Sequence, residues 1–149
     1  MRVCAFTGHR DLFKYDFDEQ LLERVVLNLV KTGVKKFLCG MAIGFDLKAA
    51  QAVLALKENY GVELVACLPC INQADVFSAK NKALYNKILS NCDEVIVFER
   101  EYTRGCMFTR DRYLVDNSDV IVCFLRKKSG GTYYTVNYAK KSAKKIIEL

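Results

Sequence analysis

The stretch DVIVCFLRKKSGGTYYTVNYAKKSAK, residues 119–144, indicates the fold more clearly than any other part of the chain. It opens with the strand-like segment Asp119–Leu125, in which every residue after the aspartate is apolar, so that both faces of the strand can be buried. A glycine-containing loop follows, and then the helix-like segment Thr132–Lys144. A buried strand that leads through a short loop into a helix is the building unit of α/β folds with a parallel sheet.

The same alternation runs through the rest of the chain. Further strands are expected at Val3–Thr7, Lys36–Cys39, Gly61–Leu68, Glu94–Phe98 and Lys145–Leu149. Further helices are expected at Phe17–Lys31, Ile43–Asn59, Gln73–Ser90 and Met107–Asn117. Asp16 or Asp18 can cap the first helix, Gly33 ends it, and Pro69 closes the third strand. The sequence therefore predicts an α/β fold: a single Rossmann-like doubly wound domain over residues 1–149, with a mostly parallel sheet of about six strands flanked by helices.

The composition indicates the class of protein. A chain of 149 residues that is 52% hydrophobic suits one domain with its own core. We expect no membrane segment, because no apolar run approaches the roughly 20 residues that cross a bilayer, and no basic leader with an apolar core precedes the first strand. The seven cysteines are an odd number, and several lie within or at the end of apolar runs (Cys4, Cys39, Cys67 and Cys123). These features predict reduced thiols and a cytoplasmic protein.

The positive charge is unevenly distributed. The net charge is +6, and residues 100–149 carry all of this excess, with 11 basic and 5 acidic side chains. An anionic partner for this part of the chain is one interpretation. The simpler interpretation of Lys140, Lys141, Lys144 and Lys145 is a solvated helix face, because positive charge also stabilises the C-terminal end of a helix.

The loops that follow the predicted strands carry the candidate site, because doubly wound sheets bind ligands at the carboxyl ends of their strands. After the first strand, Thr7 offers a hydroxyl, Gly8 permits a tight turn, and Arg10 offers a planar cation suited to phosphate. His9 is the only histidine in the chain and is either a general acid or base or, more simply, a polar contact. No metal site is predicted, because no second histidine can share one, and no cofactor is required.

The loop after the second strand contains Gly40 and Gly44, which let backbone N–H groups face an anion at the start of a helix. The pattern matches neither a P-loop nor a GxGxxG motif. Asp46 lies in the first turn of the helix that follows, where it either complements the helix dipole or contacts a ribose or base. Both roles stay open.

The third loop begins with the pair Cys67 and Cys70, which has CxxC spacing. The pair does not open a helix directly and has no second CxxC pair beside it, so we expect neither redox activity nor zinc binding. Gln73, three residues further on, is a candidate pocket residue.

The loop after the fifth strand is the strongest candidate phosphate site. Its two adjacent glycines free the backbone to wrap an anion, its hydroxyl residues can donate hydrogen bonds or cap the helix, and three preceding cations raise the local potential. These residues are Ser129, Gly130, Gly131 and Thr132, preceded by Arg126, Lys127 and Lys128. The alternative is an ordinary capped helix start. Arg110, from the preceding helix, would face the same edge if its loop turns inward.

Three segments together resemble the YpsA-like family of the SLOG superfamily, whose Rossmann-like fold is shared by DprA and the LOG phosphoribohydrolases. They are FTGHR (6–10), CGMAIGFDLKAA (39–50) and RDRYLVDNSDVIVCFLRKKSGGTYYTVNYAKK (110–141). The resemblance covers nearly the whole chain and implies a sensor or regulator that binds ADP-ribose, NAD or a nucleoside monophosphate. It implies phosphate on residues 130–132, opposite residues 7–10, and Arg110 as a clamp on phosphate or ribose.

The LOG enzymes hydrolyse the N-glycosidic bond of nucleoside 5′-monophosphates, using the motifs MHxRK and PGGxGTxxE. The segment MFTR, residues 107–110, is similar to the first motif and places Arg110 on its catalytic arginine. The second motif is only partly kept, because Thr135 stands where the catalytic glutamate is expected. If the chain is an enzyme, the resemblance implies such a hydrolase, with a carboxylate from Asp46, Asp75 or Asp116.

The segment GMAIGFD, residues 40–46, is similar to the SGLAxGID motif of DprA, which binds single-stranded DNA. The basic C-terminal third agrees with a nucleic-acid partner. However, the aromatic residues that would stack on bases have the helical spacing typical of packing residues (Tyr133, Tyr134 and Tyr138). A DNA- or protein-interaction module is therefore the third hypothesis, and the superfamily's pairing through helices implies a possible homodimer.

Overall fold

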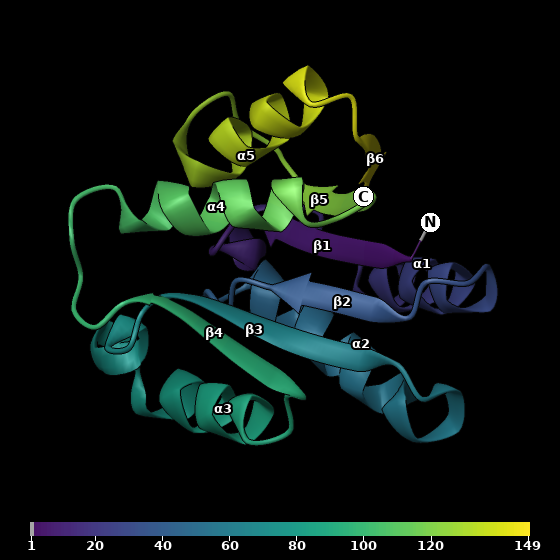
Figure 1. The fold of residues 1–149 in the computed structure, drawn as a ribbon, viewed down its shortest axis with the longest axis horizontal. Helices are drawn as coiled ribbons and strands as arrows, with labels where there is room; N and C mark the ends of the chain where they lie inside the picture. Colours follow the sequence, from purple (N-terminus) through teal and green to yellow (C-terminus); the bar gives the residue numbers. More distant parts are fainter. Residues whose placement is uncertain (1) are drawn as a thin grey trace.

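The apolar runs predicted as strands pair into one parallel sheet in the computed structural model, which describes residues 2–149 (Figure 1). Within these residues the strands are β1 Val3–Gly8, β2 Lys36–Cys39, β3 Glu63–Cys70, β4 Glu94–Glu99, β5 Val120–Phe124 and β6 Lys145–Glu148. Their order is β4-β3-β2-β1-β5-β6, and every neighbouring pair is parallel. The predicted α/β fold with a parallel sheet is confirmed, and the strand order reverses between β1 and β5.

Helices cover both faces of the sheet, because successive strand residues point to opposite faces and both sets are apolar. Among residues 2–149 they are α1 Glu19–Lys31, α2 Phe45–Tyr60, α3 Ala79–Leu89, α4 Cys106–Asp116 and α5 Gly130–Lys141, with short 3-10 turns η1 Leu12–Lys14 and η2 Gln73–Val76. Phe6 and Phe37 face α1, α2 and α3, and their rings stack with centroids 5.8 Å apart. Ala5 and Leu38 face α4 and α5, which Figure 1 shows together above the strands.

Each of the five predicted helices differs from the structure at one or both ends, and two of them differ most. The segment expected to be one helix from Gln73 to Ser90 is divided into η2 and α3, because Phe77 is extended and the Ser78 side chain accepts a hydrogen bond from the Asn81 N–H to cap α3. The last helix begins at Gly130 rather than Thr132, and it ends at Lys141, two residues before Ala143 adopts a positive φ of 56°.

The third strand extends past Pro69 to Cys70, where the sequence predicted that the proline closes it. The physical reason is the length of its neighbour: β2 ends at Cys39, opposite Ala66, so β3 has only β4 beside it at the proline. A residue without an N–H is tolerated where a strand has a free edge.

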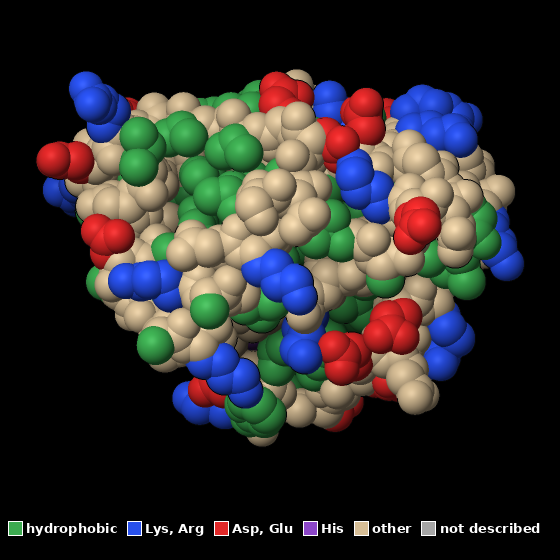
Figure 2. All heavy atoms as spheres, turned by 90° about the horizontal axis from the view of Figure 1, so that it is seen from below, with side chains coloured by type: hydrophobic (Ala, Val, Ile, Leu, Met, Phe, Trp, Pro, Cys, Tyr) green, Lys and Arg blue, Asp and Glu red, His purple; other side chains and the backbone are tan. Residues whose placement is uncertain are grey.

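The edge strand β4 leaves Val95 and Val97 partly exposed, at 44% and 39%. Figure 2, which views the molecule from below, shows hydrophobic side chains in one larger patch and in smaller groups elsewhere, with charged side chains of both signs scattered among them. This face therefore has no single-sign field of the kind that binds nucleic acid through its phosphates. In residues 2–149, the helices are all too short or too polar to cross a membrane.

Candidate functional site

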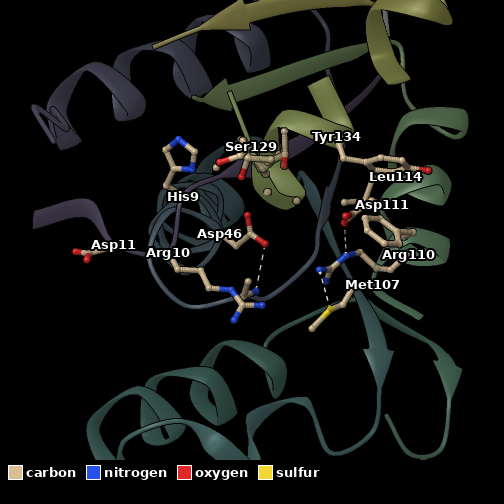
Figure 3. Close-up of a pocket in the computed structure, with 18 of the residues that line it drawn as sticks. His9, Arg10, Asp11, Asp46, Met107, Arg110, Asp111, Leu114, Ser129 and Tyr134 are labelled. Carbon is tan, nitrogen blue, oxygen red and sulfur yellow. Dashed lines mark hydrogen bonds and ion pairs between the residues drawn. The ribbon is translucent and has the colours of Figure 1, made fainter. Parts of the chain in front are cut away.

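A cavity of about 610 Å³ opens at the carboxyl edge of the sheet, between the loops that follow β1 and β5 and the start of α4 (Figure 3). This is the point where the strand order reverses, the usual ligand site of a doubly wound sheet. Its volume lies within the range of about 300–1,000 Å³ that is common for small-molecule sites.

Most of the predicted ligand-binding residues meet in the walls of this cavity. They are Thr7, Gly8, His9, Arg10, Asp46, Arg110, Ser129, Gly130, Gly131 and Thr132. Figure 3 shows His9, Arg10 and Asp11 on one side, Arg110, Asp111 and Tyr134 on the other, and Asp46 and Ser129 between them. Gly40, Gly44 and Gln73 are not among the lining residues; they lie behind the wall, and a ligand contact from them stays a prediction.

Arg110 is buried, at 5% exposure, and is held by the protein itself. Its Nη1 donates to the carbonyl oxygens of Gly40 and Cys67, and its Nε donates to Asp111 Oδ1 at 2.7 Å. A Cβ on Gly40 would lie 2.6 Å from Arg110 Nη1, so the glycine is what admits the guanidinium. Burial alone would lower the Arg110 pKa, but the carboxylates of Asp111 and Asp46 outweigh it and raise the pKa.

Asp46 lies in the first turn of α2 and is 6% exposed. Its Oδ2 accepts a hydrogen bond from the Ala42 N–H at 3.2 Å, while its buried Oδ1 has no hydrogen-bond partner among the described residues. Burial raises the pKa of Asp46 to about 6, against the opposing effects of Arg110 and the Ala42 N–H. A buried acceptor without a partner is costly unless a ligand satisfies it.

The geometry around His9 argues against its use as a general base. Its Nε2 already accepts the Arg126 N–H at 2.7 Å, which assigns the proton of the neutral ring to Nδ1. Burial lowers the pKa of His9, and the charges of Lys127 and Arg126 lower it further, so the ring is neutral at pH 7. The ring also packs against Tyr15, with centroids 5.2 Å apart. His9 therefore holds the loops after β1 and β5 together, with Nδ1–H as its remaining donor.

Two further glycines, Gly8 and Gly44, let the cavity's loops approach α2 closely. A Cβ on Gly8 would lie 2.3 Å from the Phe45 ring, and a Cβ on Gly44 would lie 2.2 Å from the Arg10 carbonyl oxygen. Gln73 supports the same region, since its Nε2 donates to the Gly40 carbonyl at 3.2 Å. These residues shape the cavity by packing.

The start of α5 faces the cavity with Gly130 and Gly131 in its first turn. Ser129 occupies the N-cap position, but its side chain makes no capping hydrogen bond, contrary to the alternative of an ordinary capped helix start. Thr135, which stands in place of the LOG glutamate, donates from Oγ1 to the Gly131 carbonyl at 2.8 Å and is bonded into the helix.

Asp111 is a cavity residue that the sequence reasoning missed. It is 8% exposed, and its Oδ2 lies 3.9 Å from where a Cβ on Gly131 would be. The clue in the sequence was its place directly after Arg110, where the LOG motif has a lysine. Asp75 and Asp116, the carboxylates considered for hydrolysis besides Asp46, are exposed and do not line the cavity.

The CxxC pair lies inside β3 rather than in the loop after it. Burial raises the pKa of Cys67 to about 12 and also raises the pKa of Cys70, which is the opposite of an activated thiol. Within residues 2–149 no group of three or more His, Cys, Asp or Glu side chains is arranged to hold a metal ion.

Comparison with known proteins gives a family and a fold. A family model described as the YspA SLOG family (YpsA) matches residues 4–148. A UPF0398 protein of Listeria monocytogenes is 27% identical over 147 residues, which cover 90% of this chain and 81% of the relative. The uncharacterized SPbeta prophage-derived protein YoqJ of Bacillus subtilis is 28% identical over 137 residues, covering 83% of this chain and 80% of YoqJ.

Solved structures share the fold at low identity. DNA processing protein A of Helicobacter pylori, which binds single-stranded DNA, has a TM-score of 0.73 at 18% identity, covering 99% of this chain and 64% of its own. The DprA of Streptococcus pneumoniae has a TM-score of 0.71 at 18% identity, and the match covers 99% of this chain and 50% of the DprA chain. The molybdenum cofactor carrier protein of Chlamydomonas reinhardtii has a TM-score of 0.62 at 16% identity, and the match covers 99% of this chain and 76% of the carrier protein. This chain therefore spans about two thirds of the length of the Helicobacter pylori protein and half the length of the Streptococcus pneumoniae protein.

Proposed function

Because the chain belongs to the YspA SLOG family, we propose that its cavity binds a nucleotide or nucleotide-derived ligand of the ADP-ribose, NAD or nucleoside monophosphate type, in a sensory or regulatory role. The observation that carries this proposal is the convergence of three features on one cavity. These are the N-terminal turn of α5, the cationic loop after β1, and a buried carboxylate without a full set of partners.

The phosphate end of the ligand lies at the start of α5 in this proposal. The N–H groups of residues 130–132 are in the first turn, where they have no partner within the helix and carry the positive end of its dipole. Arg10 and Lys127 line the same cavity and add positive charge, and the Thr7 and Thr132 hydroxyls can donate to phosphate oxygens.

The ribose lies near Asp46. Its unpartnered Oδ1 accepts a hydrogen bond from a ribose hydroxyl, and this removes the cost of leaving a buried carboxylate oxygen without a donor. Arg110 is already engaged by Asp111 and two carbonyls, so its contribution is to hold the positive charge beside Asp46 rather than to reach far into the cavity.

A second candidate function is hydrolysis of the N-glycosidic bond, and the position of Asp111 favours it. The glutamate of the LOG motif is replaced by Thr135, but Asp111, which pairs with Arg110, brings a carboxylate close to Gly131 in the first turn of α5. A carboxylate there stabilises positive charge that develops on the ribose as the bond to the base breaks. Water then completes the reaction to give the free base and ribose 5-phosphate.

A third candidate is binding of single-stranded DNA. It is favoured by the structural likeness to DNA processing protein A, and by the excess of basic side chains in residues 100–149. The likeness to a molybdenum cofactor carrier shows that the same fold also serves proteins with small-molecule cargo.

The test is a thermal-denaturation panel with AMP, ADP-ribose, NAD and a short single-stranded DNA. A ligand present at about 100 times its Kd adds about 2.7 kcal/mol to the free energy of unfolding, which raises Tm measurably in a domain of this size. We expect a shift with at least one of the three small ligands. A shift with DNA alone, or with none of them at millimolar concentration, would contradict the proposal.

A matched pair of variants locates the site. Arg10→Gln removes a cation from the cavity wall, and we expect it to reduce the nucleotide-induced shift. Arg24→Gln removes an exposed arginine of α1 outside the cavity and should leave the shift unchanged. Chromatography of the AMP mixture separates binder from hydrolase: release of adenine that Asp111→Asn abolishes would favour the second candidate, and intact AMP would exclude it for this nucleotide.

A further inference from the structure

The cavity has two chemically different ends. Opposite the loop after β1, its wall carries Tyr134 from α5, which contacts Phe108 from α4. Tyr102, from the segment before α4, also lines the cavity. Phe108 and Tyr102 remain 45% and 64% exposed, whereas Phe6, Phe37 and the other core rings are fully buried. Large aromatic side chains that stay exposed at the mouth of a cavity mark a binding surface rather than a packing core.

The aromatic wall is held in place from behind. The Phe108 and Tyr134 ring centroids are 4.5 Å apart, and their planes are inclined by 56°. Tyr134 Oη accepts a hydrogen bond from Arg112 Nη1 at 2.9 Å, and its ring stacks on Tyr138 with centroids 6.4 Å apart. Tyr138 in turn donates to Asp116 Oδ1 at 2.9 Å. The rings are therefore preorganised, and little side-chain freedom is lost when a ligand binds.

We propose that Phe108 and Tyr134 form the subsite for a planar heteroaromatic ring, the base of a nucleotide-type ligand whose phosphate lies at the start of α5. The inference rests on the proposed function and narrows it to ligands that carry a base. The faces of Phe and Tyr rings are electron-rich and stack on the electron-poor ring of a nucleobase in an offset arrangement. Tyr102, which is 64% exposed, lines the same cavity and is a further aromatic side chain available to the base.

The polarity of the cavity supports this assignment. Apart from Arg110, which α4 supplies and Asp111 pairs, the cations that line the cavity come from the loops after β1 and β5. The N-terminus of α5 follows the β5 loop, and Figure 3 shows His9 and Arg10 across the cavity from Tyr134. Asp46 lies between the two sides. A phosphate, a ribose and a base, in that order, match this sequence of cationic, carboxylate and aromatic surfaces.

The experiment compares ligands with and without a base. Calorimetric titration of AMP, ADP-ribose and ribose 5-phosphate is carried out on the wild type, Phe108→Leu and Tyr134→Leu. Loss of one stacked ring is expected to weaken AMP and ADP-ribose binding about 5- to 150-fold, the range measured for base–aromatic stacking. Ribose 5-phosphate binding should be unchanged, because this ligand has no ring to stack.

Control variants separate stacking from other effects. Tyr134→Phe keeps the ring and loses the hydroxyl, and it should bind AMP much more tightly than Tyr134→Leu. Phe13→Leu removes a fully exposed phenylalanine that does not line the cavity, and it should leave all three affinities unchanged.

Two outcomes would overturn the inference in distinguishable ways. If Phe108→Leu and Tyr134→Leu changed the affinities for AMP and ribose 5-phosphate equally, or left the AMP affinity unchanged, the base subsite would be wrong. The proposal that the cavity binds nucleotides would still stand. Failure of the wild type to bind either nucleotide or ribose 5-phosphate would overturn the proposed function together with the subsite.

Discussion

Arg110 and Gly40 show how one side chain depends on the absence of another. The buried guanidinium reaches the Gly40 carbonyl only because no Cβ stands in its way. Asp111 neutralises it from one side, and Asp46 lies near it on the other. The charges in the floor of the cavity are thus a connected set, and changing one member alters the others.

Replacement of Gly40 by alanine should displace Arg110 and lower the free energy of unfolding by about 1–3 kcal/mol, as overpacking does in other cores. Urea denaturation measures this loss. The matched experiment repeats Gly40→Ala in an Arg110→Ala background, where the steric conflict is gone and the added cost should be much smaller. Equal costs in both backgrounds would show that the conflict does not exist.

Asp46 gives a pH dependence whose sign can be stated. Its pKa in the folded protein is about 6, raised by burial from an ordinary 3.8, so the folded state binds the proton more tightly than the unfolded state. The contribution of Asp46 to the free energy of unfolding is therefore fully present below about pH 4 and is lost as the pH rises to about 6. The total loss is at most about 3 kcal/mol. The difference in unfolding free energy between the wild type and Asp46→Asn should follow this trend.

Asp119 should behave in the opposite way and is the natural comparison. Hydrogen bonds from the Arg2 and Val3 N–H groups lower its pKa, so its contribution is present at neutral pH and is lost on acidification. Asp119→Asn should accordingly be less stable than the wild type at pH 7, and the gap should close as the pH falls. If Asp46→Asn and Asp119→Asn showed the same trend, the burial argument for Asp46 would be wrong.

At the scale of elements, the junction between β5 and α5 decides what the cavity can bind. The helix begins with Gly130 at a φ of 89°, a conformation that residues with a side chain rarely adopt, so the first-turn N–H groups depend on this glycine for their direction. The other helix that lines the cavity is α4, which contributes the Arg110–Asp111 pair and Phe108 to its wall.

Gly130→Ala should therefore lower the free energy of unfolding by about 1–2 kcal/mol and weaken AMP binding. Gly131→Ala is the matched control for stability: this glycine has no positive φ, and an added Cβ would meet only Asp111 Oδ2, at an ordinary 3.9 Å. Denaturation curves and AMP titrations of both variants check the difference. Equal losses of stability would show that the left-handed start of α5 is not needed.

At the scale of the whole molecule, the parallel sheet brings loops from distant parts of the chain to one edge. The positive charge is uneven along the sequence, but the face in Figure 2 carries charged side chains of both signs. The cations that line the cavity are few, so a ligand there meets a local site rather than an extended basic groove. A homodimer stays a prediction, which light scattering of the purified protein can check.

Salt dependence follows from this arrangement. We expect AMP affinity to fall only slightly between low and physiological ionic strength, because few counterions are released. Binding of single-stranded DNA through the basic C-terminal third would fall steeply, with a slope of about −0.7 per neutralised phosphate in a plot of log K against log salt. Titrations at three salt concentrations distinguish the two. A steep slope for AMP would contradict the assignment to a local cavity.

Much of the fold could be predicted because strands and helices leave local periodic patterns. Three predictions depend on neighbouring residues alone: the strand Asp119–Leu125, observed as Val120–Phe124, the exact span Lys36–Cys39, and a helix cap at Asp16 or Asp18, of which the structure uses Asp18. The break at Phe77 within the predicted helix Gln73–Ser90 was missed, because the packing of the extended Phe77 against Tyr85 is a tertiary contact and only with it does Ser78 become the N-cap of α3.

The sequence by itself determined the alternation of buried strands and helices, and with it the sheet edge at which the loops gather, because side-chain periodicity and strand burial follow directly from residue order. Only the tertiary structure decided which residues meet. In the structure Asp111 lies beside Gly131, and Gly40 and Gln73 do not line the cavity. Asp46 is buried, and its Oδ1 has no hydrogen-bond partner among the described residues. These relations depend on packing between elements far apart in the chain, and burial, hydrogen bonding and pKa shifts exist only once that packing has formed.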